Sequence, residues 1–189
     1  MYNTAAKRTE TSLIKFAAVL CVVSVVFFIL FLFRINSNFV SARVDGLYTI
    51  TQVHAVINRE RIARGIEPLI LNERLINAAQ NKAEDMRDKN YFSHISPIDG
   101  REWKEFIADS GYTYQEAGEN LANGYDQVGQ MVEAWLKSPS HKENMLNPNV
   151  NETGFGITYG QLEDSETIYV VQLFGKPAQE LQNTVELIE

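Results

Sequence analysis

The longest uninterrupted apolar stretch of the chain covers residues 16–33 and contains no charged side chain. As a helix, this stretch would span about 27 Å, close to the hydrocarbon thickness of a bilayer. Three basic residues, Lys7, Arg8 and Lys15, precede it, which favours a cytoplasmic N-terminus. We therefore predict a single-pass membrane protein in which residues 1–15 are cytoplasmic, residues 16–33 form the transmembrane anchor, and the rest of the chain is extracytoplasmic.

A cleaved signal peptide is the alternative to this anchor. Val40-Ser41-Ala42 offers a small-residue cleavage site. That site lies well beyond the apolar run, and the run is longer than the roughly 7 to 15 apolar residues usual in a signal peptide. We therefore prefer an uncleaved anchor, followed by a linker over 34–46, a folded domain over 47–178 and a C-terminal tail over 179–189.

Beyond the linker, apolar residues recur at helical spacing and predict a first helix that ends at Gly65. Its apolar positions are Leu47, Ile50, Val53, Ile57 and Ile62. A second helix is predicted after Asn72, a good N-cap, with a face of mostly small residues that implies close packing against another layer. A third helix, over 101–109, carries three residues that we expect in the core, Trp103, Phe106 and Ile107.

Two further helices are predicted before the pattern changes to strands. One follows Asp126, and a short one begins at Ser140, which forms a capping-box pattern with Glu143. Residues 154–160 and 167–174 then predict two strands around an acidic turn, which form an antiparallel hairpin. Helices first and paired strands last indicate an α+β fold, with helices packed on a small antiparallel sheet.

Charge and cysteine content narrow the function of the part beyond the anchor. Of the 17 Lys and Arg and 24 Asp and Glu residues of the chain, five basic and one acidic residue lie in 1–43, which leaves 12 basic and 23 acidic residues after them. An acidic surface repels phosphate backbones, so we expect no nucleic-acid partner. The single cysteine, Cys21, lies in the apolar run, so the predicted domain must be stabilised by packing without disulfides.

Three polar residues at predicted loop positions are candidates for a common site. Glu119 lies between a glycine and an asparagine where a short extended segment begins, and His94 and His141 each follow a serine near the end or start of a helix. Two imidazoles and a carboxylate on loops are how a polar site is often assembled on a rigid scaffold. His54, beside the apolar stripe of the first helix, is more typical of a packed residue.

Several motifs in order resemble the CAP superfamily of cysteine-rich secretory proteins, antigen 5 and pathogenesis-related 1 proteins, specifically its bacterial single-domain members. They are Tyr91-Phe92-Ser93-His94 followed by Ser96-Pro97, Gly118-Glu119-Asn120-Leu121, Trp135 with Ser138-Pro139-Ser140-His141 and Asn144-Met145-Leu146, and Gly154-Phe155-Gly156 leading into Val171-Gln172-Leu173-Phe174. The resemblance implies an α-β-α sandwich with a central antiparallel sheet, and a cleft lined by two histidines and two glutamates.

The resemblance assigns His94 as the first histidine of that tetrad and Glu119 as the first glutamate. The other two positions depart from the eukaryotic pattern, because Ser138 stands at the second glutamate and Tyr169 at the second histidine, while bacterial members place a histidine at His141. The cleft is thus expected to contain all five residues, with His94, Glu119 and His141 as ligands of a weakly held divalent cation, for which zinc is the candidate. Glu133 is a substitute carboxylate, although its position on the helix directs it towards water.

The function favoured by these features is a membrane-anchored binding module on a bacterial surface. Its cleft would hold a small molecule, a lipid or a cell-wall component, with a divalent cation as an aid. A zinc-dependent hydrolase acting outside the membrane is the alternative, because two histidines and a carboxylate are a catalytic zinc set in type. Against catalysis, the sequence contains no His-Glu-x-x-His or Gly-x-Ser-x-Gly motif and no cysteine beyond the apolar run. A structural or partner-docking role is the third possibility.

Overall fold

The computed structural model describes residue 24 and residues 49–179. The predicted anchor at 16–33, apart from Ser24, lies outside the described residues, as do the predicted linker and almost all of the predicted tail. Among the described residues, no helix combines the length and the apolar character needed to cross a membrane. The fold described below therefore concerns residues 49–179.

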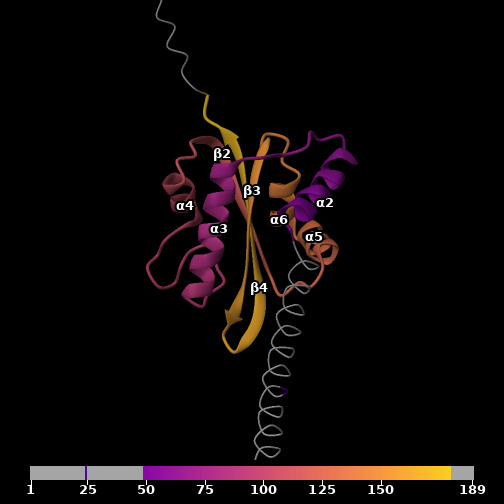
Figure 1. Cartoon of the computed structure of the whole chain (residues 1–189). Coiled ribbons are helices and arrows are strands. Elements are labelled where there is room, and N and C mark those ends of the chain that lie inside the picture. The colour runs from indigo at the N-terminus through magenta and orange to yellow at the C-terminus, as the bar shows by residue number, and fades with distance from the viewer. Residues whose placement is uncertain (1–23, 25–48, 180–189) are drawn as a thin grey trace, which may run out of the picture. The chain divides into compact units, whose positions relative to one another are not determined.

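A four-stranded sheet lies between two layers of helices, as Figure 1 shows. Its strands are β1 (Ile70–Leu71), β2 (Tyr114–Asn123), β3 (Glu152–Leu162) and β4 (Ser165–Pro177). One face carries α3 (Glu73–Asp88) and α4 (Trp103–Asp109), and the other carries α2 (Ile50–Ile62), α5 (Val128–Lys137) and α6 (Pro139–Met145). Each face has its own apolar cluster, so the layers of the predicted mixed fold are present in the described domain.

The strand order β1-β3-β4-β2 contains the predicted antiparallel hairpin of β3 and β4. The predicted antiparallel sheet is formed by β2, β3 and β4, and the structure adds β1, which pairs in parallel with β3 through Ile70 and Leu71. This strand is only two residues long and one of them, Ile70, is 64% exposed, so its sequence carries no alternating pattern that would predict it. At the opposite edge, β2 pairs with β4 alone.

The inward face of α2 differs from the predicted one at its C-terminal end. Ile62, which was assigned to the apolar stripe, is 60% exposed, and Arg61 is fully buried instead. The reason is helical geometry, since Val53, Ile57 and Arg61 are spaced four residues apart and share one face, whereas residue 62 is turned about 100° away from it.

The small residues of α3 allow it to lie directly on the backbone of β3. A Cβ atom at Gly154 would lie 2.1 Å from the backbone carbon of Leu75, and one at Gly156 would lie 2.1 Å from the carbonyl oxygen of Ala79. No side chain fits between the two elements at these positions. The predicted close packing of this helix against another layer is confirmed, and the contact holds the first half of α3 against β3.

Candidate functional site

The site is built at the outer edge of β2, the strand that has no further strand beside it. Glu119 and Leu121 turn their carbonyl groups to this edge, where Asn144 Nδ2 and Trp135 Nε1 donate hydrogen bonds to them, both at 3.0 Å. Just before them, the strand has no side chain at Gly118, where a Cβ atom would lie 3.1 Å from Asn144 Oδ1. Helix α6 is thereby held close against the strand, and the loop after α3 approaches the same edge from the other face of the sheet.

A cavity of about 260 Å³ lies between these elements. The loop after α3 contributes His94, α4 contributes Trp103, β2 contributes Ala117, Gly118 and Glu119, and α6 contributes Ser140, His141 and Asn144. The structure therefore brings His94, Glu119 and His141, which are far apart in the sequence, to one small polar cavity, which we call the edge pocket.

His94 and Glu119 form the central contact of the edge pocket. The His94 Nδ1 atom lies 2.6 Å from Glu119 Oε1, and the Glu119 side chain is 1% exposed whereas that of His94 is 53% exposed. The hydrogen bond to Glu119 raises the pKa of His94, and burial raises the pKa of Glu119. The second carboxylate oxygen, Oε2, is buried and has no hydrogen-bond partner in the structure. The buried Glu119 carboxylate thus orients the His94 ring through Nδ1. The other ring nitrogen, Nε2, is then free for a ligand.

Lys82 of α3 is a buried cation on the same side of the sheet as Glu119. Its Nζ atom donates to Tyr91 Oη at 3.0 Å, and Tyr91 Oη donates in turn to Asp85 Oδ2 at 2.6 Å. The positive charge of Lys82 lowers the pKa of Glu119 and so partly offsets the effect of burial. Sequence analysis missed Lys82, because a lysine within a helix that carries many charges gives no sign of being buried.

His141 lies opposite His94, in the first turn of α6. Helix α6 begins at Pro139 with Ser138 as N-cap, so the predicted start at Ser140 with a capping box to Glu143 is wrong. The proline at the first helical position explains the earlier start, because its fixed φ angle suits that position. Burial lowers the pKa of His141, with a smaller contribution from His94, so the neutral imidazole is favoured. The carbonyl group of His141 accepts a hydrogen bond from Asn120 Nδ2 at 3.0 Å, which attaches the helix to β2.

Two of the predicted cleft residues lie outside the edge pocket. Tyr169 is fully buried in the apolar cluster under α3 and α4, and its hydroxyl donates to the carbonyl of Gln161 at 2.6 Å. Ser138 joins α5 to α6, and its Oγ atom lies 3.4 Å from Ser140 Oγ. Neither residue lines the cavity. Strand alternation in β4 turns the side chain of Tyr169 into the core.

The remaining candidates also have structural partners. Glu133 is exposed and forms an ion pair with Lys137, at 2.6 Å, as its position on the helix predicted. His54 packs between α2 and the segment before β1, where its Nε2 atom lies 2.8 Å from the carbonyl oxygen of Leu69.

Within residues 49–179, no three His, Cys, Asp or Glu side chains are grouped so that they could hold a metal ion. In the edge pocket, the available nitrogen donors are Nε2 of His94 and the ring of His141, because His94 Nδ1 and Glu119 Oε1 engage each other and Glu119 Oε2 is buried.

Trp103 is a pocket residue that the sequence pattern assigned to the core. It opens α4 and is partly buried, whereas Phe106 and Ile107 are buried as predicted. Its amphipathic spacing with these two residues suggested the core, and only the three-dimensional position of α4 beside β2 places it at the cavity.

An α-β-α sandwich with a histidine–glutamate pair at the outer edge of its sheet is the arrangement expected for a CAP domain. The model of the Cysteine-rich secretory protein family (CAP) matches residues 54–174, more than half of this chain. The chain therefore belongs to this family, and the resemblance seen in its motifs is confirmed.

Several similar proteins are bacterial. The protein YkwD of Bacillus subtilis is 38% identical over 125 residues, which cover 66% of this chain and 46% of YkwD, and the membrane protein YlbC of the same organism is 32% identical over 56% of this chain and 30% of YlbC. The chain thus spans less than half the length of these relatives. Among solved structures, an outer surface protein of Borrelia burgdorferi matches with a TM-score of 0.58 at 26% identity, over 68% of this chain and 92% of that protein.

An extracellular protein containing an SCP domain, from Bacillus anthracis, matches with a TM-score of 0.54 at 26% identity, over 67% of this chain and 39% of that protein. These relatives are a membrane protein, an outer surface protein and an extracellular protein by name. They agree with a CAP domain that works outside the cytoplasm, which remains a proposal for this chain.

Proposed function

We propose that this protein is a membrane-anchored, extracytoplasmic binding protein whose edge pocket holds a sugar unit of a cell-wall component. The observation that carries the proposal is the His94–Glu119 pair, in which a buried carboxylate fixes an exposed imidazole at the mouth of a small cavity. A rigidly held polar group in a concave site is how a protein orients a small ligand. The size of about 260 Å³ favours one sugar or amino-acid unit over a whole lipid.

The chemistry of the lining supports a polar ligand. Three side chains, His141, Ser140 and Asn144, offer hydrogen-bonding groups from α6, and Trp103 offers an aromatic surface from α4. Sugars present hydroxyl groups at their rims and apolar C–H groups on their faces, so they use both kinds of surface. Ser140 Oγ has Ser138 Oγ as its partner rather than an imidazole, so binding is favoured over hydrolysis by an activated serine.

A divalent cation is proposed as an accessory ligand of the same pocket. His94 and His141 would be its nitrogen donors, and Glu119 would orient His94, as carboxylates commonly do for metal-binding histidines. A cation held by two protein donors completes its coordination with water, so we expect weak binding, and zinc suits imidazole donors. The bound cation would supply a positive charge that polarises ligand oxygens.

Calorimetric titration tests the proposal. The full-length chain, purified in detergent, is titrated with an N-acetylated cell-wall disaccharide, with and without zinc. We expect binding with a Kd on the order of 1 mM or tighter, and a loss of at least about tenfold in His94→Ala and Glu119→Gln. Glu133→Ala, on the exposed side of α5, is the control and should bind like wild type.

Equal binding by the wild type and His94→Ala, or no binding by either, would contradict the proposal. Zinc-dependent cleavage of the disaccharide that disappears in His94→Ala would instead favour the hydrolase.

A further inference from the structure

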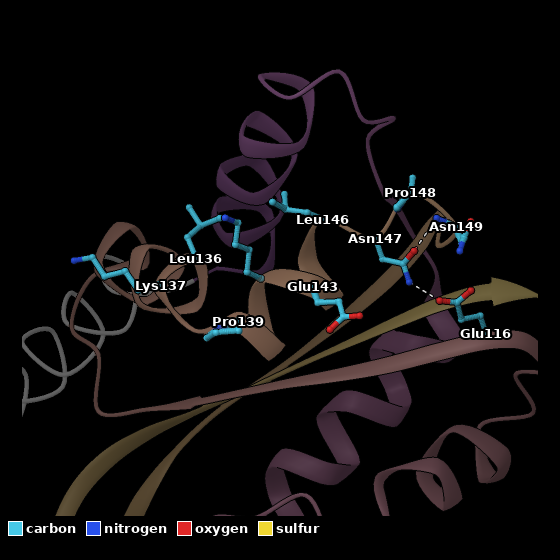
Figure 2. Close-up of a pocket in the computed structure, with 10 residues that line it drawn as sticks. Glu116, Leu136, Lys137, Pro139, Glu143, Leu146, Asn147, Pro148 and Asn149 are labelled. Atoms are coloured by element: carbon cyan, nitrogen blue, oxygen red, sulfur yellow. Dashed lines mark hydrogen bonds between the residues drawn. The ribbon is translucent and has the colours of Figure 1, made fainter.

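A second and larger cavity, of about 710 Å³, lies on the other side of α6 from the edge pocket. We call it the α6 groove, and Figure 2 shows its lining. Ser140, His141 and Asn144 of α6 line the edge pocket, whereas Pro139, Lys142 and Glu143 line the groove. On β2, two consecutive residues line different cavities, because Glu116 lines the groove and Ala117 lines the pocket. The two cavities therefore share α6 and β2 as walls, and neighbouring residues of both elements line one cavity or the other.

The wall of the groove is held in place by Arg61, the buried arginine of α2. Its guanidinium donates to the carbonyl groups of Met145 and Asn147, both at 2.9 Å, and of Val150 at 3.1 Å. These carbonyl groups bracket the segment that contributes Asn147, Pro148 and Asn149 to the groove. Because a buried side chain fixes its backbone, this wall exists before any ligand arrives, which reduces the entropy that binding must cost.

The groove presents charges of both signs beside apolar side chains. Leu136 and Leu146 supply apolar surface, and Lys142 and Glu143 are exposed neighbours in the middle of α6. Within residues 49–179, the side chains of Lys142 and Glu143 form no ion pair or hydrogen bond. The other acid of the groove, Glu116, accepts a hydrogen bond from Asn147 Nδ2. In Figure 2, Glu143, Asn147 and Glu116 follow one another along the groove, with Lys137 at the opposite end.

Lys137 differs from Lys142, because it is already paired with Glu133. Among the described residues, Lys142 is thus the unpaired basic group of the groove, which suits a ligand carboxylate. Glu143 is the unpaired acidic group, which suits a ligand amine, and Glu116, already bonded to Asn147, is a second acidic group of the lining. A partner that matches this pattern carries a carboxylate and a free amino group on a short, partly apolar chain. A short peptide with a basic side chain has that chemistry, whereas a lipid tail or an uncharged glycan does not use the charges.

We propose that the α6 groove is a second subsite that holds a short peptide bearing a free amine and a carboxylate, covalently linked to the sugar in the edge pocket. The ligand would then be a glycopeptide that passes over α6 beside β2. This inference rests on the proposed sugar binding for the linked ligand, but the peptide subsite itself can be tested alone. Two linked groups bind more tightly than either one, because the second binding step becomes intramolecular.

The experiment compares three probes by calorimetry on the full-length chain in detergent. They are the N-acetylated disaccharide, the same disaccharide carrying a tetrapeptide with one free side-chain amine, and the free tetrapeptide. In the wild type, we expect the disaccharide–peptide to bind on the order of tenfold more tightly than the disaccharide. A Lys142→Ala/Glu143→Ala double variant should lose this advantage while its affinity for the bare disaccharide stays within about twofold.

The matched control is an Arg59→Ala/Glu166→Ala double variant, which also removes one base and one acid from exposed positions outside the groove. It should keep the full advantage of the peptide. Equal affinities for the two sugar probes in wild type, or an advantage that survives in the Lys142→Ala/Glu143→Ala variant, would overturn the inference. If the free tetrapeptide binds and the double variant abolishes this binding while the disaccharide does not bind at all, the groove subsite stands and the proposed sugar pocket fails.

Discussion

The two faces of the sheet each bury one cation, and the two cations are satisfied in different ways. Arg61, between α2 and the segment after α6, donates to four backbone carbonyl groups, including Glu67 O at 2.8 Å, and is paired with no carboxylate. Lys82, under α3 and α4, donates one hydrogen bond, to Tyr91, and lies at 4.9 Å and 5.4 Å from the ring centroids of Tyr91 and Phe106. They are the two buried basic residues of the described part of the chain.

This difference in hydrogen bonding indicates that Arg61 supports the fold, whereas Lys82 belongs to the surroundings of the candidate site. Arg61 links α2 to backbone carbonyl groups that lie 84 to 89 residues further along the sequence. Lys82 instead makes a single hydrogen bond, and its charge acts on a buried carboxylate, Glu119, that has an unpaired oxygen. Unused polar capacity in a core is costly, and such features concentrate at functional sites. The face under α3 and α4 therefore supports the edge pocket, and the opposite face holds the groove wall in shape.

Replacing Arg61 should have the largest effect on stability. Arg61→Met removes the donor of four carbonyl groups, and those of Met145 and Val150 are left without a partner in a buried site, so we expect a loss of about 3 to 5 kcal/mol in the free energy of unfolding. Urea unfolding followed by circular dichroism measures the loss. Arg59→Met, an exposed change on the same helix, should alter stability by less than about 0.5 kcal/mol. A small loss in Arg61→Met would show that the carbonyl cross-links are dispensable.

Replacing Lys82 should cost less and should depend on pH. Lys82→Met fills a similar volume but removes one hydrogen bond and the positive charge that lowers the pKa of Glu119. We expect a loss of about 2 kcal/mol. Without the cation the pKa of Glu119 rises further, so the folded state of the variant is penalised wherever Glu119 must be ionised. The loss should thus be greater at pH 8 than at pH 5, as measured by urea unfolding at both values.

The control for this substitution is Lys137→Met, which removes an exposed lysine whose side chain is 74% exposed. It should change stability by less than about 1 kcal/mol at both pH values. If Lys82→Met lowers stability equally at pH 5 and pH 8, the charge of Lys82 does not influence the ionisation of Glu119, and the electrostatic difference between Lys82 and Arg61 is contradicted.

The smallest predicted effect concerns the two histidines of the edge pocket, which should titrate on opposite sides of the ordinary histidine pKa of about 6.5. Glu119 raises the pKa of His94, and burial lowers that of His141. Because the raised pKa belongs to the folded state, His94 stabilises the fold fully below about pH 6.5, and this contribution is lost as the pH rises through its folded value. NMR titration of the imidazole Cε1 protons gives both pKa values.

In Glu119→Gln the pKa of His94 should fall towards its ordinary value. The resonances of His54, which packs against the segment before β1, serve as the control and should be the same in the variant and the wild type. The reverse order of the His94 and His141 pKa values in the wild type would show that the pair at 2.6 Å does not persist in solution.

The sequence alone predicts those helices and strands whose buried residues recur at regular helical or strand spacing. The helix after Asn72, with its small residues, and the hairpin of β3 and β4 were predicted because local spacing determines which side is buried. His94, Glu119 and His141 were found because each belongs to a distinctive motif, and all three line one cavity.

The errors arise where a residue is buried by distant partners. Arg61 satisfies carbonyl groups near residues 145–150, so no pattern around position 61 could show that it, and not Ile62, faces inward. Tyr169 was placed in the cleft by correspondence with a family position, whereas strand alternation and its bond to Gln161 hold it in the core. Lys82 is buried, and Trp103 lines the pocket, only once α3 and α4 have packed against the sheet.

The most direct test of the edge pocket is a map of ligand-induced NMR shifts on the isotope-labelled full-length chain in detergent. On addition of the N-acetylated disaccharide, we predict that the largest shifts occur at the Trp103 indole, the Gly118 amide and the His94 and His141 imidazoles, and that they disappear in His94→Ala. Shifts that cluster elsewhere, for example around Asn72 and Tyr112, which line a separate cavity, or shifts that persist unchanged in His94→Ala, would contradict the account.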